Sequence, residues 1–281
     1  MSAFKINIDQ FETPYKLSPE ELLLEGGSSE GYVVPWHSTD AFVYDCIMKA
    51  KSVFKTDFAK NGTVMWLLPA LPFQSELKTL FATSLQQCFG TPLEHLFFEG
   101  CHGIHSALML AQQSSLENVS VIAIDGVFKA NKREQFDYLG VAASTANIEF
   151  INTGWVLQSA EMVASIDLAK HNPIQGELKR VLSLNEQPID IIFAPGNGVE
   201  SDDWLNYLPV LSNKINEQTI FQLPNYKLGK LGALEGIINL ATLTNSPFYN
   251  DSLSQALVIT QESNKYQAVA SYLWTSKEVC N

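Results

Sequence analysis

The sequence predicts an α/β fold in which helices and strands pack in layers. Three observations favour it: strand-like apolar runs alternate with helical segments, no low-complexity linker divides the chain, and hydrophobic residues make up 46% of its 281 positions. Repeated alternation of this kind is typical of layered α/β proteins. The apolar content supports a sizeable core and excludes a disordered chain.

The first half of the sequence shows a regular succession of elements. Helical periodicity is clear at 39–59, where Thr39 or Asp40 is the expected N-cap. A second helix at 73–89 should end at Gly90, because glycine readily adopts the left-handed backbone of a helix C-terminus. The other elements expected here are strands at 63–68, 96–99, 119–125, 138–144 and 148–152 and a helix from about 103 to 113.

The second half continues the alternation. Its apolar and β-branched runs predict strands, and its longer mixed segments predict helices. The helical segments are expected near 159–170, 175–183 and 230–244, and the strands at 189–195, 219–223, 255–260 and 266–273.

Two segments of the chain share one plan. Residues 94–111 and 190–207 each combine a buried strand, a tight turn containing glycine and a helix, and their turns lie 94 positions apart. Duplication of an α/β half would produce such a match. We therefore expect a single domain over residues 1–281, with a first half of about 1–152 and a second half of about 153–281.

The charge of the chain and its cysteine content limit which classes of partner and which cellular compartment we expect. The chain carries 18 Lys and Arg against 30 Asp and Glu, a net charge of −12, and an acidic surface repels the phosphates of nucleic acids and anionic membranes. Its start lacks the pattern of a secretory signal, and its most apolar stretch, 64–73, is too short to span a membrane. The four cysteines show neither metal-ligand spacing nor a dense disulfide framework. We expect a reduced cytoplasmic compartment, no metal and no cofactor.

Two short motifs are interpreted as loops. GSSEG at 27–31 matches the nucleophile elbow G-x-S-x-G but lacks the strand that must precede it. PGNGVES at 195–201 follows a strand but lacks the third glycine of a dinucleotide loop, and acidic residues flank it. Neither motif predicts a site.

Cys101 is the residue that carries the most chemical information. It lies in EGCHGIHSAL, between an apolar strand and a helix. A helix N-terminus lowers the pKa of a thiol, and a thiolate there could attack a thioester, with His102 or His105 to activate or orient it. The alternative is a small buried cysteine that fills the junction of strand and helix. The residues alone leave both interpretations open.

Several segments resemble the β-ketoacyl synthases of the thiolase superfamily. GCHGIHSALMLA at 100–111 resembles their nucleophile segment, and YLGVAAS at 138–144 resembles their Asp-Gly-Ala-Ala strand. IDIIFAPGNGVESDD at 189–203 resembles the strand that ends in a His-Gly-Thr-Gly-Thr loop, and 225–243 resembles their last catalytic segment. The segments follow the family order over about 94–243. The resemblance implies a thiolase-like layered fold with two similar α/β halves.

The departures from the family pattern imply a site without working catalysis. Cys101 matches the nucleophile, but Pro195 stands where the histidine of the second segment should be. Aligning the family glycines places Lys230 at the last histidine and Asn225 at the lysine. Those histidines stabilise the enolate and the thioester oxyanion. Proline has no side-chain donor, and lysine has a different geometry.

This pattern resembles that of chain-length factors, ketosynthase-like subunits without a working triad. The resemblance implies a heterodimer with an active β-ketoacyl synthase, whose acyl channel the chain would help to shape in polyene or polyketide synthesis. The small size resembles most the subunit of bacterial aryl polyene synthesis. An acyl carrier protein, usually acidic itself, would dock on the partner. The fold and its interface would be what persists when catalysis is lost.

The interface and channel are expected near the nucleophile-like turn. The strand at 94–99 and the turn at 100–105 should lie close to the partner, and the candidates that face the interface or channel are Phe97, Phe98, His102 and His105. In a strand the two phenylalanines point to opposite faces, so at most one of them can face a channel.

Two rival functions stay open. A thiolase-like acyltransferase would use Cys101, which chain-length factors of aromatic polyketide systems commonly replace by glutamine. A structural protein of this fold would have no role in polyketide synthesis.

Overall fold

Strands and helices alternate through the part of the chain that the computed structural model describes, namely residues 2–14, 38–54, 62–71, 74–90, 93–130, 136–164, 174–184, 187–196, 203–246, 253–263 and 266–276. The elements up to residue 151 are β1 (Ala3–Glu12), α2 (Thr39–Val53), β2 (Thr63–Leu67), α3 (Ser75–Phe89), β3 (His95–Phe97), the 3₁₀ turn η2 (Gly100–His102), α4 (Gly103–Gln113), β4 (Asn118–Ala130) and β5 (Phe136–Ile151). From residue 154 they are β6 (Gly154–Ala164), α5 (Gln175–Ser183), β7 (Ile191–Phe193), the 3₁₀ turn η3 (Asp203–Tyr207), α6 (Leu208–Leu211), β8 (Ile220–Gln222), α7 (Pro224–Leu228), α8 (Ala233–Asn245), β9 (Gln255–Ser263) and β10 (Tyr266–Thr275). None of these helices has the length and hydropathy needed to cross a membrane.

The strands form one continuous sheet in the order β3-β2-β4-β5-β1-β6-β10-β9-β7-β8. β2 is parallel to both β3 and β4, whereas β4, β5 and β1 pair antiparallel. The other end repeats this arrangement: β7 is parallel to β8 and β9, and β9, β10 and β6 pair antiparallel. A single residue pair, Phe4 with Trp155, connects the two five-strand groups through β1 and β6.

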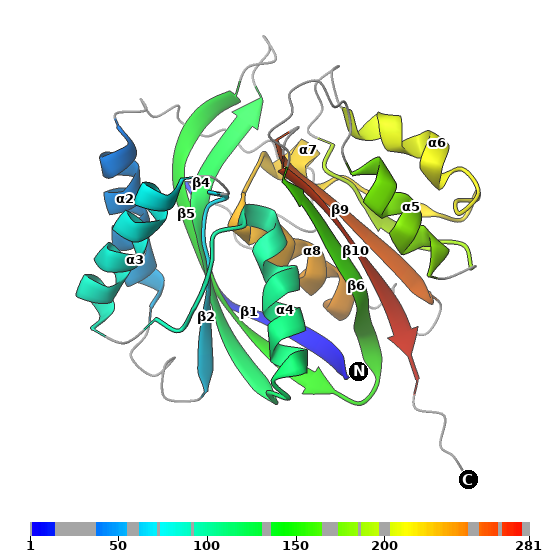
Figure 1. Cartoon of the computed structure of the whole chain (residues 1–281), viewed down its shortest axis with the longest axis horizontal. Helices are drawn as coiled ribbons and strands as arrows, with labels where there is room; N and C mark the ends of the chain where they lie inside the picture. Colours follow the sequence, from blue (N-terminus) through cyan, green and yellow to red (C-terminus); the bar gives the residue numbers. More distant parts are fainter. Residues whose placement is uncertain are drawn as a thin grey trace.

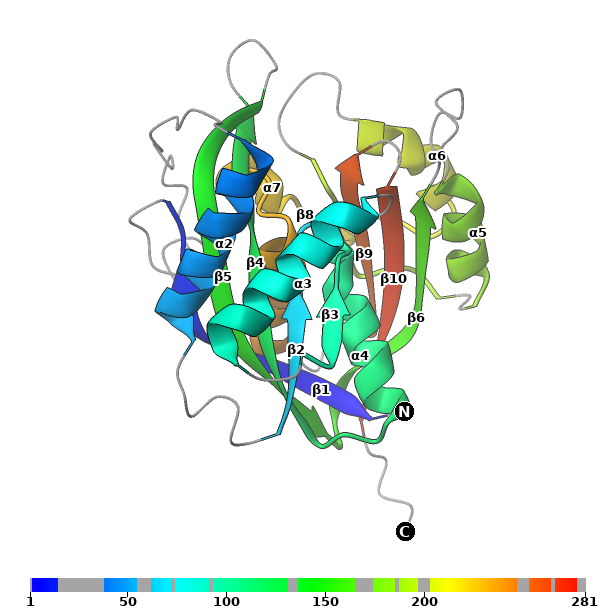
Figure 2. The same cartoon turned by 60° about the vertical axis from the view of Figure 1, so that its left-hand side comes forward.

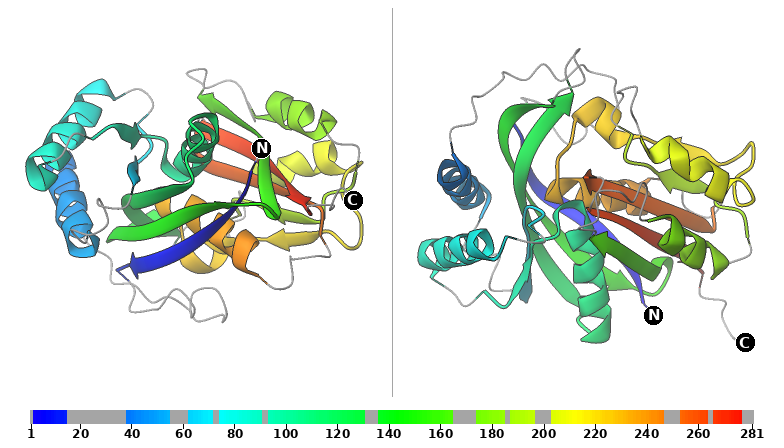
Figure 3. Two further views of the ribbon diagram at one scale, coloured as in Figure 1. Left: turned by 90° about the horizontal axis from the view of Figure 1, so that it is seen from below. Right: turned by 45° about the horizontal axis from the view of Figure 1, so that its top comes forward.

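Helices cover both groups of strands and also fill the space between them. Figure 1 shows α2 and α3 on one outer side, α4 and α8 in the middle, and α5 and α6 on the other outer side. Figures 2 and 3 show the same layering from other directions. Three buried apolar clusters match these layers, with the central cluster joining α4 and α8 to the inner faces of both strand groups. The predicted layered α/β architecture is therefore confirmed.

The strand order shows which segments of the two halves occupy equivalent places. β1–β5 and β6–β10 follow the same order within their groups, so β2 corresponds to β7 and β3 to β8. The predicted match between 94–111 and 190–207 is therefore wrong in register, because it pairs an edge strand, β3, with an interior strand, β7. By the same order α4 corresponds to α8, and these two helices pack together in the central layer.

Burial on both faces explains the continuous apolar run of β4. Val121 and Ala123 belong to the central cluster, whereas Ile122 and Ile124 face α2 and α3 in the first outer cluster. A strand covered on both sides shows no polar alternation. The sequence predicts this strand at 119–125, and the observed strand, Asn118–Ala130, is longer.

Several predicted elements agree closely with the structure. The helix expected from about 103 to 113 is α4, and α3 ends at Gly90, whose φ of +66° is the left-handed value expected of a C-terminal glycine. The N-cap of α2 is not Thr39 or Asp40 but Ser38, whose hydroxyl oxygen accepts the Ala41 N–H at 3.1 Å. α2 ends at Val53, and residues 55–59 of the predicted helix lie outside the described residues.

Three predictions in strand regions are wrong. The segment from 159 to 164 is strand β6 rather than helix, because pairing with β10 overrides its helix-favouring Ala, Glu and Met. The strands expected at 138–144 and 148–152 are one strand, β5, continuous through Asn147, whose amide hydrogen-bonds with Ser120 and Asp9. β1 was not predicted. Residues 27–31, 165–170 and 197–202 lie outside the described residues.

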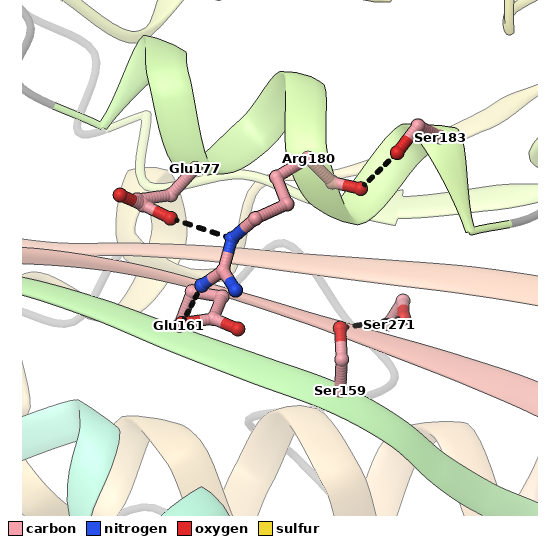
Figure 4. Close-up of polar contacts among 6 residues, drawn as sticks. All are labelled: Ser159, Glu161, Glu177, Arg180, Ser183 and Ser271. Carbon is pink, nitrogen blue, oxygen red and sulfur yellow. Dashed lines mark hydrogen bonds and ion pairs between the residues drawn. The ribbon is translucent and has the colours of Figure 1, made fainter.

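An ion-pair network attaches the second outer helix layer to the sheet. Arg180 of α5 pairs with Glu177 on the same helix, at 3.0 Å, and with Glu161 of β6 (Figure 4). Nearby, the hydroxyls of Ser159 on β6 and Ser271 on β10 lie 3.4 Å apart. These polar contacts lie on the α5 side of the sheet.

Candidate functional site

The ends of two parallel strands hold the turn that carries Cys101. The Leu68 N–H donates to the Phe97 carbonyl (2.8 Å), and the Gly100 N–H donates to the Leu68 carbonyl (3.0 Å). Gly100 has a φ of +56°, in the left-handed region that glycine tolerates. This conformation leads the chain from β3 into η2 and α4, so Cys101 lies between an apolar strand and the start of a helix, as the sequence predicts.

Helix α8 packs directly on this turn. A β-carbon added at Gly236 would lie 2.5 Å from the Cys101 carbonyl oxygen and 2.6 Å from Ile104 Cγ2. Glycine is therefore required where the two central helices meet. The contact places the first turn of α8 beside the nucleophile-like cysteine.

The Cys101 side chain is enclosed and has acidic neighbours. It is 1% exposed, its Sγ lies 3.6 Å from His102 Nδ1, and its backbone N–H donates to Glu262 Oε1 at 2.6 Å. Burial raises the pKa of the Cys101 thiol well above its usual value, and the charges of Glu262 and Glu235 raise it further. The prediction that the helix N-terminus lowers this pKa is wrong, because desolvation and acidic neighbours outweigh the helix dipole.

The two histidines of the turn face the β9–β10 hairpin. His102 Nδ1 shares a hydrogen bond with Thr260 Oγ1, and His105 Nδ1 shares one with the Tyr272 hydroxyl, each at 2.5 Å. Burial lowers the pKa of both histidines to about 3, so both are neutral at pH 7. Of the two, His102 is the one in contact with the cysteine sulfur. Both are buried within the chain, and their assignment to an interface or channel stays a prediction.

The second acidic group beside Cys101, Glu235, lies in the first turn of α8. Burial raises the pKa of Glu235 to about 8, with a contribution from the charge of Glu262, while Asn225 and Lys230 oppose the rise. Asn225 and Lys230 are the residues predicted to stand at the positions of the family lysine and histidine, and that alignment stays a prediction. In this chain both act on a buried carboxyl group, and the Lys230 backbone also bridges to Phe128 of β4.

Asp125, at the site side of β4, caps helix α8. Its carboxylate accepts the Ala233 N–H at 2.9 Å and the Gly126 N–H at 2.7 Å. Burial raises the pKa of Asp125, and the charge of Glu262 adds to this, against the two backbone hydrogen bonds. Gly232, with a φ of +51°, lies against the same carboxylate where a β-carbon would overlap it. The first strand group thus positions the helix that carries Glu235.

The remaining predicted residues are Pro195, Phe97 and Phe98. Pro195 is buried directly after β7 and offers no side-chain donor. Phe97 packs against the central cluster, whereas Phe98 packs against the outer cluster, 6.0 Å from the Phe81 ring. The predicted opposite orientation of the two phenylalanines is confirmed. Phe97 is the one on the same side as α4, where its Cβ would lie 3.4 Å from a β-carbon added at Gly103.

Sequence reasoning missed the acidic groups. Asp125 and Glu235 are single charges inside apolar runs, and each precedes a glycine, in AIDGV and ALEGI. A lone charge in a buried run is a usable signal, because burying an unpaired carboxylate is costly. Glu262 gives no such signal, because it lies at the polar end of β9 and reaches Cys101 across 161 positions. Among the described residues, no three His, Cys, Asp or Glu side chains are arranged to hold a metal ion.

The fold of the chain is similar to that of thiolase-like ketosynthases of known structure. Among solved structures, an oxazolomycin ketosynthase domain from Streptomyces albus has a similar fold, with a TM-score of 0.59, 12% identity, and 97% and 96% of the two chains covered. A type II polyketide synthase acyl-carrier protein in complex with its ketosynthase gives a TM-score of 0.53 at 11% identity, with 97% and 99% covered.

A ketosynthase from module 6 of the Bacillus subtilis bacillaene synthase is also similar, with a TM-score of 0.51 at 10% identity. Here the alignment covers 85% of this chain and 56% of the other. No family profile and no curated protein matches the sequence. The chain therefore has the fold of thiolase-like ketosynthases, as predicted.

Proposed function

We propose that the chain is a non-catalytic ketosynthase-like subunit, a chain-length factor that pairs with an active β-ketoacyl synthase. The observation that carries this proposal is the state of the nucleophile position. Cys101 is enclosed, its thiol pKa is raised, and a carboxylate occupies its backbone N–H. Condensation needs a reactive thiolate and free hydrogen-bond donors for the oxyanion. In the predicted alignment, Pro195 and Lys230 replace the two family histidines that would provide such donors.

The partner would join at the edge of the first strand group. β3 is a terminal strand of the sheet and leads directly into the Cys101 turn. An unpaired edge is a ready template for another strand. Pairing there would bring the Cys101 turn and Phe97 close to the partner's acyl channel, where they could limit the length of the product.

The reaction context is polyene or polyketide synthesis in the cytoplasm, and the small size favours an aryl polyene system. One structure with a similar fold holds an acyl-carrier protein with its ketosynthase. The net charge of −12 disfavours docking of an acidic carrier on this chain. The carrier would then bind the catalytic partner and reach this subunit only through it.

A second candidate is an acyltransferase that uses Cys101. It is favoured by the retained thiol and by His102 Nδ1, 3.6 Å from Sγ. In this function Sγ attacks the carbonyl of an acyl thioester, a new C–S bond forms, and the donor thiol leaves with the cysteine proton. It predicts that an acyl thioester alone adds an acyl mass to Cys101 without any partner.

The test of the proposed function is copurification. The tagged chain is co-expressed with an active β-ketoacyl synthase of an aryl polyene pathway, and the eluate is analysed by native mass spectrometry. We expect a one-to-one complex. The matched control is a ketosynthase from an unrelated pathway, which should not copurify. Equal recovery of both ketosynthases, or of neither, would contradict the proposal.

A further inference from the structure

The β9–β10 hairpin covers the Cys101 turn through three separate contacts. Thr260 shares a hydrogen bond with His102, Glu262 accepts the Cys101 N–H, and the Tyr266 ring lies 4.8 Å from the His102 ring. All three come from within seven residues of one hairpin. The hairpin therefore closes over the nucleophile position from the second strand group.

The Glu262 carboxylate has a place shaped for it. At Gly100 a β-carbon would lie 2.6 Å from Glu262 Cδ and would overlap one carboxylate oxygen. A side chain at position 100 would therefore exclude this approach. Together with the 2.6 Å hydrogen bond from Cys101, this fit shows a specific contact rather than a surface side chain resting on the turn.

The contact with Glu262 occupies the backbone N–H of Cys101, which is then no longer available to another hydrogen-bond acceptor. This N–H group lies where the 3₁₀ turn η2 leads into α4, and backbone N–H groups beside a nucleophile are what stabilises the oxyanion of an acyl group. A carboxylate on that N–H takes the hydrogen bond that an acyl oxygen would need, and it brings a negative charge. When an acyl group is attacked by Sγ, the negative oxygen that forms on its carbonyl carbon would therefore collide with the Glu262 carboxylate and be repelled by its charge.

We propose that the Glu262 carboxylate permanently accepts the hydrogen bond of the Cys101 backbone N–H and in this way prevents electrophiles from reacting with the Cys101 thiol. The closure is a property of this chain's own hairpin and is separate from the loss of the family histidines. Glu262 is half-buried next to the hairpin turn, whereas Thr260 beside it is fully buried. Removal of the Glu262 carboxylate should therefore open the site without unpacking the core.

The test measures alkylation of Cys101 by iodoacetamide, a small neutral reagent, in Glu262→Ala and Glu262→Gln. The sulfur forms a bond to carbon, iodide leaves, and the thiol proton passes to buffer. Peptide mass mapping follows each cysteine in the full chain, alone or with its partner. We expect at least about a tenfold faster reaction at Cys101 in Glu262→Ala, the effect of about one pKa unit on the thiolate fraction.

The glutamine variant separates occupancy from charge. It keeps an oxygen acceptor of the same size, so its Cys101 should react faster than the wild-type thiol but more slowly than in Glu262→Ala. Glu161→Ala is the matched control, because it removes a carboxylate from the same strand group at the Arg180 pair (Figure 4) and should leave Cys101 unchanged. Cys46 of α2, which is 0% exposed, reports on global opening in the same samples.

A wild-type rate in Glu262→Ala would overturn the proposal, as would equal rates in the alanine and glutamine variants. Faster labelling of Cys46 alongside Cys101 would show loosening of the fold and would also contradict it. If Glu262→Ala does not fold, the nearly isosteric glutamine variant must still exceed wild type. The assay needs neither condensation nor a partner, so it can fail while the proposed function holds.

Discussion

At the residue scale, the buried carboxyl group of Glu235 should make the stability of the fold depend on pH. Burial holds the pKa of Glu235 at about 8 in the folded chain, against an ordinary value of 4.5. Between these values the folded chain keeps a proton that the unfolded chain releases. The free energy of unfolding should therefore fall as pH rises through this window, and the stabilising effect should be lost above the folded pKa.

Glu235→Gln should remove much of this pH dependence. A neutral amide of the same shape needs no proton, so the decline of up to about 1.4 kcal/mol per pH unit should flatten. Urea unfolding at pH 5, 6, 7 and 8 measures this. Asp125 contributes in the same direction, so some slope should persist. Glu161→Gln serves as the control, and an unchanged slope in Glu235→Gln would show that the carboxyl group is already ionised.

The residue scale also shows where sequence reasoning succeeds. The cysteine, the glycine turn and the helix after it are local features, so Cys101 could be placed correctly. The raised thiol pKa could not be predicted, because Glu262 and Glu235 come from distant elements. The helix-dipole effect on a pKa can be inferred from residues adjacent in the sequence, whereas the desolvation effect depends on how the folded chain packs around the group.

At the scale of elements, β3 sets the direction of two adjacent aromatic side chains. Phe97 faces the central layer and Phe98 faces α3. Phe97→Ala should therefore lengthen the product of a reconstituted complex, because it enlarges the space beside the Cys101 turn. Phe98→Ala should leave the product unchanged and lower stability by at most about 3–5 kcal/mol.

Product analysis by mass spectrometry, with thermal melting of each complex, separates these effects. The two variants remove the same side chain from neighbouring positions, so each is the control for the other. Unchanged product length in both, with an intact heterodimer, would remove Phe97 as a determinant of length. A changed product length in Phe98→Ala alone would place the acyl channel on the α3 side of the sheet and would contradict the role of Phe97.

The same scale explains which elements the sequence could and could not predict. α3 carries a strong local signal, its C-terminal glycine, and the predictions of α3 and α4 are confirmed. β6 has helix-favouring residues and becomes a strand only because β10 pairs with it. β1 crosses between the two strand groups, and its role depends on partners more than 130 residues away.

At the scale of the whole molecule, two five-strand groups share one order around a central pair of helices. The alternation predicts the layers, but the register of the repeat follows from strand pairing and was wrong from sequence alone. The single-domain organisation with halves at about 1–152 and 153–281 stays a prediction.

Expression of the chain without the proposed partner should give self-association or aggregation. Obligate interfaces bury roughly 2,000 Å² or more of largely apolar surface, and the β3 edge is a template on which another strand can pair. Analytical ultracentrifugation at micromolar concentration measures the mass. A stable, monodisperse monomer would argue against an obligate pair.

The central claim is that this subunit supports condensation without performing it. The most direct measurement compares turnover of the reconstituted complex carrying Cys101→Ala with that of the complex in which the partner's nucleophilic cysteine is replaced. The account predicts nearly full activity in the first complex and none in the second. Loss of turnover with Cys101→Ala, while the complex stays assembled, would contradict it and assign the chemistry to this chain.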